Sequence, residues 1–160
     1  MNPLKANDPG LIYDIHPDDY ILYLCGLNYT DQQVGMIMQN EVQCSLMEII
    51  PEAQLNYPSF SIKLGSGKQV YSRAVTNVGE ETSTYELIVE NCMEVDIVVS
   101  PKELVFIESN QKLTYTVTFS STRKSGDAKY SGKDSTCIGA AIIWNDGKHR
   151  VGSPIYFQDA

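Results

Sequence analysis

The sequence predicts a mainly β fold, an antiparallel β-sandwich preceded by a short helical segment. From Leu55 onward, apolar residues alternate with polar ones in short runs, which is the pattern of strands with one face on a core and one in water. Turn-forming residues separate the runs, and no long helical pattern lies between them. Before Leu55, the apolar residues repeat at helical spacing instead.

Two short helices are expected before the strands. The first follows Pro17, with Asp18 or Asp19 as its N-terminal cap, and ends at Gly26, because glycine tolerates the left-handed conformation of a helix end. The second starts at Thr30 with the spacing of a capping box, a threonine followed three residues later by a glutamine. Its apolar stripe consists of Val34, Ile37 and Met38.

The clearest predicted strand covers residues 112–119, where every second side chain is apolar. Three further runs alternate in the same way, with inward-facing residues Phe60, Ile62 and Leu64, then Tyr85, Leu87 and Val89, then Val95, Ile97 and Val99. Asp146-Gly147 is a favoured pair for a tight hairpin. Residues 121–136 are polar and predict a long loop. About seven strands with such turns favour a sandwich.

Composition excludes several classes of function. The chain has 160 residues, with 20 acidic and 12 basic side chains and a net charge of -8. Such a charge disfavours binding to nucleic acid or to anionic lipid, and no apolar run approaches the roughly 20 residues that span a bilayer. The N-terminus lacks the apolar core of a secretory signal.

Several motifs in one order point to a known family. They are residues 6–15 (ANDPGLIYDI), 18–20 (DDY), 23–25 (YLC), 55–62 (LNYPSFSI), 75–79 (VTNVG), 144–151 (WNDGKHRV) and 153–155 (SPI). Together they resemble the C-terminal part of a plant subtilisin-like serine protease, of the S8 peptidase family. The resemblance implies that residues 1–54 correspond to the end of the catalytic region and its linker, and residues 55–160 to a fibronectin type III-like sandwich.

The resemblance also implies a function. The catalytic Asp, His and Ser of that family lie upstream of the region that this chain resembles, so serine endopeptidase activity belongs to the parent protein. The chain is then expected to be a non-catalytic accessory domain that packs on the catalytic domain, in the apoplast. Because the resemblance implies secretion while the N-terminus lacks a secretory signal, we expect a fragment or a truncated gene product. The alternatives are a free-standing sandwich that binds a protein or a polysaccharide, and a truncated product without function. The apolar residues within 11–25 exceed what two short helices can cover, which favours docking on a partner.

The four cysteines contain no C-x-x-C pair, which argues against a zinc ribbon or a redox motif. The resemblance implies a disulfide between Cys25 and Cys44, while two buried thiols are the alternative. It gives no pairing for Cys92 and Cys137, which stays open. Asn28 begins the sequon Asn-Tyr-Thr and is the expected glycosylation site.

No catalytic, cofactor or metal site is expected. The two histidines are His16 and His149, and Asp14 lies near the first, so a Ser-His-Asp triad is conceivable; nothing in the sequence indicates its geometry. Two positions depart from the family pattern. Ala74 stands where threonine is usual, and Gly152 stands where arginine is usual, which removes a possible polar anchor for a neighbouring domain.

Overall fold

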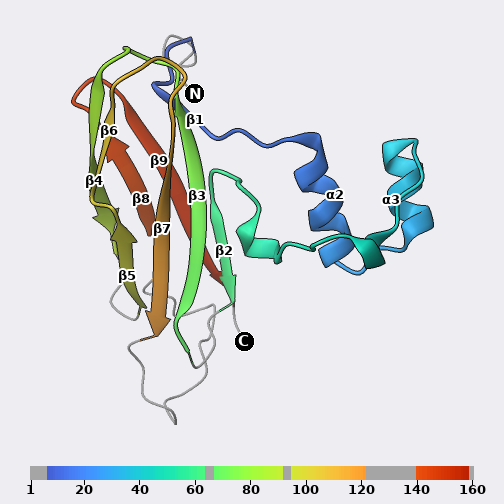
Figure 1. The fold of residues 1–160 in the computed structure, drawn as a ribbon. Helices are drawn as coiled ribbons and strands as arrows, with labels where there is room; N and C mark the ends of the chain where they lie inside the picture. The colour runs from blue at the N-terminus through green and yellow to red at the C-terminus, as the bar shows by residue number, and fades with distance from the viewer. Residues whose placement is uncertain (1–6, 64–66, 92–94, 122–139, 159–160) are drawn as a thin grey trace.

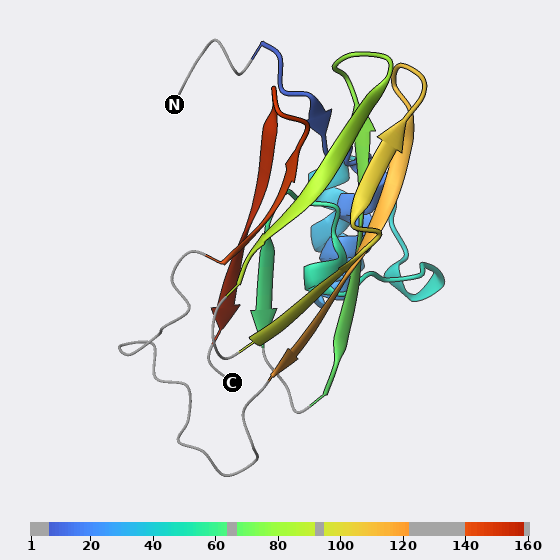
Figure 2. The same cartoon turned by 90° about the vertical axis from the view of Figure 1, so that its left-hand side faces the viewer.

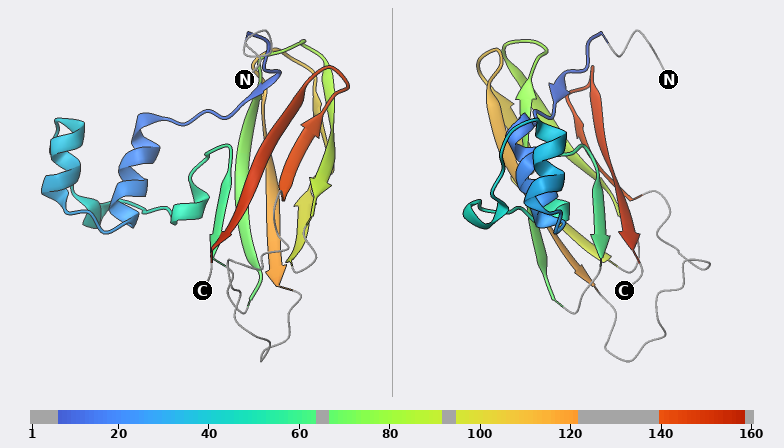
Figure 3. Two further views of the ribbon diagram at one scale, coloured as in Figure 1. Left: turned by 180° about the vertical axis from the view of Figure 1, so that it is seen from behind. Right: turned by 90° about the vertical axis from the view of Figure 1, so that its right-hand side faces the viewer.

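Two β-sheets face each other, and a helical segment projects from one side of the pair (Figure 1; Figure 3). The computed structural model describes residues 7–63, 67–91, 95–121 and 140–158. Within these residues the first sheet has the strand order β1-β3-β7-β5, and the second has the order β2-β9-β8-β4-β6. The predicted sandwich with a helical segment before it is confirmed. We call residues 17–49 the helical arm.

The first sheet is antiparallel throughout its described pairs. Its strands are β1 (Leu11–Ile12), β3 (Gln69–Asn77), β7 (Lys112–Ser121) and β5 (Val95–Ser100). The strand expected over 112–119 is therefore present as β7. Because β1 lies in this sheet, part of the segment expected to be loop and helix contributes to the sandwich.

The second sheet contains a parallel pair. Its strands are β2 (Phe60–Lys63), β9 (Arg150–Gln158), β8 (Ala141–Asn145), β4 (Ser83–Glu90) and β6 (Glu103–Phe106). Strand β2 runs parallel to β9, with Phe60 opposite Ile155, whereas the other described pairs are antiparallel (Figure 2). No hairpin joins β2 to β9 in the chain, so no tight turn imposes the antiparallel direction that the sequence pattern favoured.

The core lies between the sheets and is rich in aromatic side chains. Trp144 and Tyr115 are fully buried, and their rings pack edge to face with centroids 5.1 Å apart. Phe119 packs against Phe60 and Phe157 in the same manner. The inward-facing residues expected in the strands are buried or partly buried, apart from Leu64, which lies outside the described residues. The polar run 121–136 also lies outside them, except for Ser121 at the end of β7.

Two of the sequence motifs, residues 6–15 and 75–79, meet at one place on the sandwich. In the register of β1 with β3, Leu11 is opposite Asn77. The Gly10 carbonyl accepts hydrogen bonds from the backbone N–H groups of Val78 (2.9 Å) and Gly79 (3.2 Å). Gly10 has a φ of +75°, and a Cβ there would lie 2.6 Å from the Tyr85 hydroxyl. A side chain at this position is therefore excluded both by the backbone conformation and by space.

Beyond its short pairing with β1, the outer edge of β3 is hydrogen-bonded by side chains rather than by a neighbouring strand. Asn56 accepts from the Ala74 N–H and donates to the Ala74 carbonyl, both at 2.9 Å. At Ser72 the N–H donates to the side chain of Gln54 at 3.4 Å, and the carbonyl accepts from Arg73 at 2.9 Å. The short 3-10 helix η2 (Glu52–Gln54) and the chain after it are fixed to the sandwich by these bonds.

Candidate docking surface

Helix α2 (Pro17–Gly26) begins at a histidine. The Nδ1 atom of His16 accepts from the Asp18 N–H at 3.4 Å, while Asp19 accepts from the His16 N–H at 2.9 Å. The cap is therefore His16, and the expectation of Asp18 or Asp19 was wrong; Asp19 completes the capping box instead.

Helix α2 ends at Gly26, as expected, but Gly26 is not left-handed. The left-handed residue is Asn28, two positions later, with a φ of 64°. A Cβ on Gly26 would lie 2.5 Å from the Ile50 carbonyl oxygen. Glycine is needed at position 26 for this close approach rather than for a left-handed conformation.

Helix α3 (Asp31–Met38) has the capping box that the sequence predicts. Thr30 Oγ1 accepts from the Gln33 N–H, and the Gln33 side chain accepts from the Thr30 N–H. The predicted stripe is only partly correct, because Val34 is buried and Met38 partly buried, while 61% of Ile37 is exposed. The core of the arm is very small, so the turn of α3 that carries Ile37 has no apolar surface within the arm to cover it.

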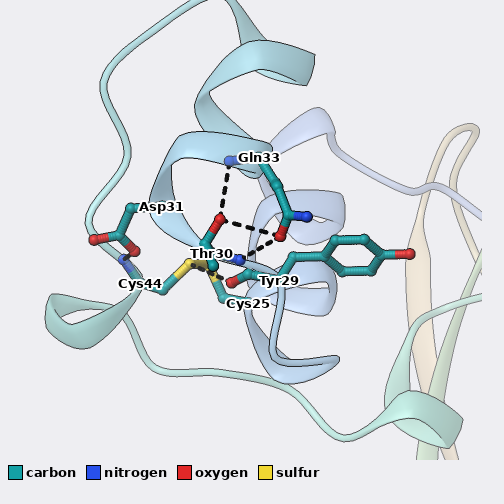
Figure 4. The surroundings of a disulfide bond; sticks show 6 residues. All are labelled: Cys25, Tyr29, Thr30, Asp31, Gln33 and Cys44. Atoms are coloured by element: carbon teal, nitrogen blue, oxygen red, sulfur yellow. Dashed lines mark hydrogen bonds between the residues drawn. A yellow bond between two sulfur atoms is a disulfide. The ribbon is translucent and has the colours of Figure 1, made fainter.

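A disulfide between Cys25 and Cys44 holds the arm together (Figure 4). The Asp31 carboxylate also accepts from the Cys44 N–H at 2.9 Å, so the 3-10 turn η1 (Cys44–Leu46) is tied to the start of α3. The buried residues of the arm are few: Cys25, Val34 and Val42. Closing a loop with a sequence separation of 19 residues stabilises by roughly 3 kcal/mol, which offsets the small size of this core.

The surface of the arm is apolar and acidic. Its large apolar side chains with exposed fractions between 37% and 79% are Tyr20, Leu27, Tyr29, Met36, Ile37, Leu46 and Ile49. Its charged side chains are all acidic: Asp18, Asp19, Asp31, Glu41 and Glu48, and the sequence has no Lys or Arg between residues 6 and 62. Apolar surface gathered on one small projecting element is typical of an interface.

A pocket of about 320 Å³ lies where α2 meets the sandwich. It is lined by Tyr20, Tyr23, Ala53, Leu55, Tyr57, Ser59, Ser61 and Arg73. Arg73 is almost fully buried, and its guanidinium donates to the carbonyl groups of Ala53, Tyr57 and Ser59 at 2.8–3.2 Å. Burial lowers the pKa of Arg73 from its usual value. Nothing in the sequence indicates that this arginine is buried, because its partners are backbone carbonyl groups, which leave no mark in a residue pattern.

The residues considered for a catalytic triad do not assemble into one. Asp14 accepts from the Thr76 hydroxyl at 2.5 Å and pairs with Lys112 at 3.3 Å, away from His16. His149 does have a carboxylate on Nδ1, from Asp146 at 2.8 Å, but its Nε2 faces the Asp8 carboxylate at 3.0 Å. A serine protease needs a serine hydroxyl at that position.

The other expected site residues have different outcomes. Asn28 is exposed in the turn between α2 and α3. Cys92 and Cys137 lie outside the described residues. Across the residues that are described, no group of three or more His, Cys, Asp or Glu side chains is arranged to hold a metal ion. In the same part of the chain, no helix combines the length and apolarity needed to cross a bilayer.

The sheet order and the projecting arm define a β-sandwich domain with an appended pair of helices. A family model for the fibronectin type-III domain matches residues 54–157, and the chain belongs to that family. Over 97% of its length it is similar to Arabidopsis thaliana proteins named subtilisin-like protease SBT1.7 (38% identical), SBT4.13 (37%) and SBT3.5 (37%). It covers 20%, 21% and 19% of them, respectively, so it spans about a fifth of their length, and it corresponds to a C-terminal region.

Proposed function

We propose that this chain is a non-catalytic accessory region of a plant subtilisin-like protease, and that its helical arm docks on the catalytic domain. Residues 1–54 then correspond to the connection to that domain, although their strand β1 belongs to the sandwich, and residues 55–160 supply the rest of the sandwich. The observation that carries the proposal is the exposed apolar surface of an arm that has only three buried residues of its own. Similarity to subtilisin-like proteases supports the choice of partner.

The charges of the arm specify the partner's surface more closely. Because the arm carries acidic side chains and no Lys or Arg, a complementary surface is apolar at its centre and basic at its rim. The pocket beside α2 adds a place for one side chain of the partner, between Tyr20 and Tyr57. Both tyrosines are partly exposed, at 42% and 54%. Binding should therefore weaken as salt concentration rises, since exposed charges at a rim are screened.

The test is a pull-down of this chain with the catalytic domain of a similar protease that lacks its own C-terminal fifth. Ile37→Glu on the arm should reduce binding at least tenfold, because it places a charge at the centre of an apolar contact. Ile107→Glu on the sandwich is the matched control, since Ile107 is exposed to a similar extent (69% against 61%). Equal binding by the two variants would show that the arm is not the docking surface.

The isolated chain should self-associate, since its arm has no partner to cover it. Size-exclusion chromatography of the wild type and of Ile37→Glu measures this. A wild-type monomer with no affinity for the catalytic domain would contradict the proposal and favour the alternative, a free-standing binding module. The observation that favours that alternative is the tyrosine-lined pocket, whose aromatic and hydroxyl groups are typical of a site for a polar ligand with apolar faces.

We also propose that the chain is secreted to the apoplast and carries a glycan at Asn28. The Cys25–Cys44 disulfide supports an oxidising compartment, and Asn28 is exposed in a turn, where a glycan fits. The chain secreted from plant cells should lose mass on treatment with a glycosidase. Asn28→Gln should abolish that loss, whereas Asn110→Gln, at an exposed left-handed asparagine outside a sequon, should leave it unchanged.

A further inference from the structure

His149 is buried in the turn between β8 and β9, with a carboxylate on each side of its ring. Asp146, in the same turn, hydrogen-bonds to Nδ1 at 2.8 Å. Asp8, from the segment that enters the sandwich, lies 3.0 Å from Nε2. The two partners are far apart in the sequence, so this imidazole links the entering segment to the turn.

The backbone of the entering segment also packs directly against the His149 ring, at Gly10. A Cβ on Gly10 would lie 2.7 Å from the His149 ring, so the chain passes directly against it. The carbonyl of Gly10 then accepts from Val78 and Gly79 on the other side. Lys148 reinforces the link by pairing with Asp8 at 3.5 Å and Glu80 at 3.1 Å.

We propose that His149 is the pH-sensitive element of a clasp that holds residues 8–12 on the sandwich when its ring is protonated and loosens when the ring loses its proton. A protonated imidazole donates from Nδ1 to Asp146 and places its positive charge, at Nε2, 3.0 Å from the Asp8 carboxylate. A neutral ring has one N–H, so one nitrogen lone pair then faces a carboxylate without a proton between them. Because residues 13–16 join residues 8–12 to the arm, the clasp controls how firmly the base of the arm is attached. This inference goes beyond the proposed function, since it concerns the sandwich whether or not the arm binds a protease.

The direction of the effect follows from the groups around the ring. The hydrogen bond to Asp146 raises the pKa of His149, burial opposes this, and Asp8 adds to the increase. The stability that protonated His149 contributes is therefore complete below its unfolded pKa of about 6.5. It is lost as pH rises through the higher pKa that His149 has in the folded protein.

The titratable groups around His149 do not change their charge over the pH range in which His149 loses its proton. The pKa of Asp8 is lowered by its hydrogen bond with His149. For Asp146, burial raises the pKa but hydrogen bonds with His149 and Lys148 lower it further, so both carboxylates stay ionised. Contact with Glu80 and Asp8 raises the pKa of Lys148, and burial raises that of Tyr85, so the lysine stays charged and the tyrosine neutral.

The test is amide hydrogen exchange of Val78 and Gly79, whose N–H groups report on the Gly10 contact. Their protection factors, corrected for the intrinsic effect of pH, should fall roughly three- to tenfold between pH 5.5 and 8.5 in the wild type. His149→Gln should remove this fall. The matched control is His16→Gln, at the exposed cap of α2, which should leave the fall unchanged.

A second variant covers the case in which His149→Gln fails to fold. Asp8 is half-exposed, so Asp8→Asn should keep the fold and reduce the fall at least twofold, by removing one of the two carboxylates. Wild-type protection that does not change with pH would overturn the proposal. A fall of equal size in Asp8→Asn and the wild type would do so as well, because the entering segment would then not depend on the ion pair.

Discussion

Replacing Arg73 by methionine should cost the sandwich about 3 kcal/mol of unfolding free energy. The guanidinium donates four hydrogen bonds to backbone carbonyl groups, at 2.8–3.2 Å, and stacks 4.2 Å from the ring centroid of Phe60. Methionine keeps most of the apolar contact but makes none of these bonds. Bonds from a charged donor contribute roughly 1.5–3 kcal/mol each, for a gross loss of about 6 kcal/mol or more.

Part of that loss is recovered, because the wild type buries a charge. None of the described carboxylates forms an ion pair with Arg73, so its desolvation is offset only by carbonyl groups. Removing a charge buried in this way also removes its desolvation penalty, which is several kcal/mol. The difference between the two effects leaves a net loss of about 3 kcal/mol, within the range observed when a buried polar network is broken.

Chemical denaturation followed by the fluorescence of Trp144 measures this loss, because Trp144 is the only tryptophan of the chain and is fully buried. The matched control is Arg150→Met. Arg150 is exposed and pairs with Glu90 at 2.7 Å, so its replacement should cost less than about 1 kcal/mol. Equal losses in the two variants would refute the view that Arg73 joins η2 and the start of β2 to β3.

Three further experiments test other features. Cys25→Ser with Cys44→Ser should destabilise the arm by roughly 3 kcal/mol, seen as faster amide exchange in α2 and α3, while Trp144 reports an unchanged sandwich. Gly10→Ala should lower the unfolding free energy by about 2 kcal/mol in the same denaturation assay. The control is Gly152→Ala, whose Cβ would meet only Ile143 Cγ1 at 3.8 Å. It should change the unfolding free energy by less than about 0.5 kcal/mol. Gly152→Arg should fold normally and tighten binding to the catalytic domain, measured by calorimetry; weaker binding would contradict a docking role for that position.

The strands of the sandwich were predictable because their pattern is local. In β7, the alternation of Leu113, Tyr115, Val117 and Phe119 with threonines assigns each side chain to a face without reference to any other strand. The capping box at Thr30 is equally local, since its two partners lie three residues apart.

The features that the sequence did not reveal depend on distant partners. Strand β1 has only two residues, too short for any period, and it exists because Leu11 and Ile12 pair with the end of β3. The parallel direction of β2 depends on β9, which is about 90 residues away in the chain. In the candidate surface, Ile37 follows the apolar spacing of a buried stripe, yet it is exposed because the arm supplies no third element to cover it.

The outer edge of β3 has a consequence for aggregation. Strand β3 has nine residues, and β1 pairs only with Thr76 and Asn77. The rest of its outer edge offers backbone groups on which a strand from another molecule could add, and so begin a polymer. Here, the amide side chains of Gln54 and Asn56 already occupy the backbone groups of Ser72 and Ala74. Two residues outside the strands therefore make the outer edge of β3 a poor template for the addition of another strand.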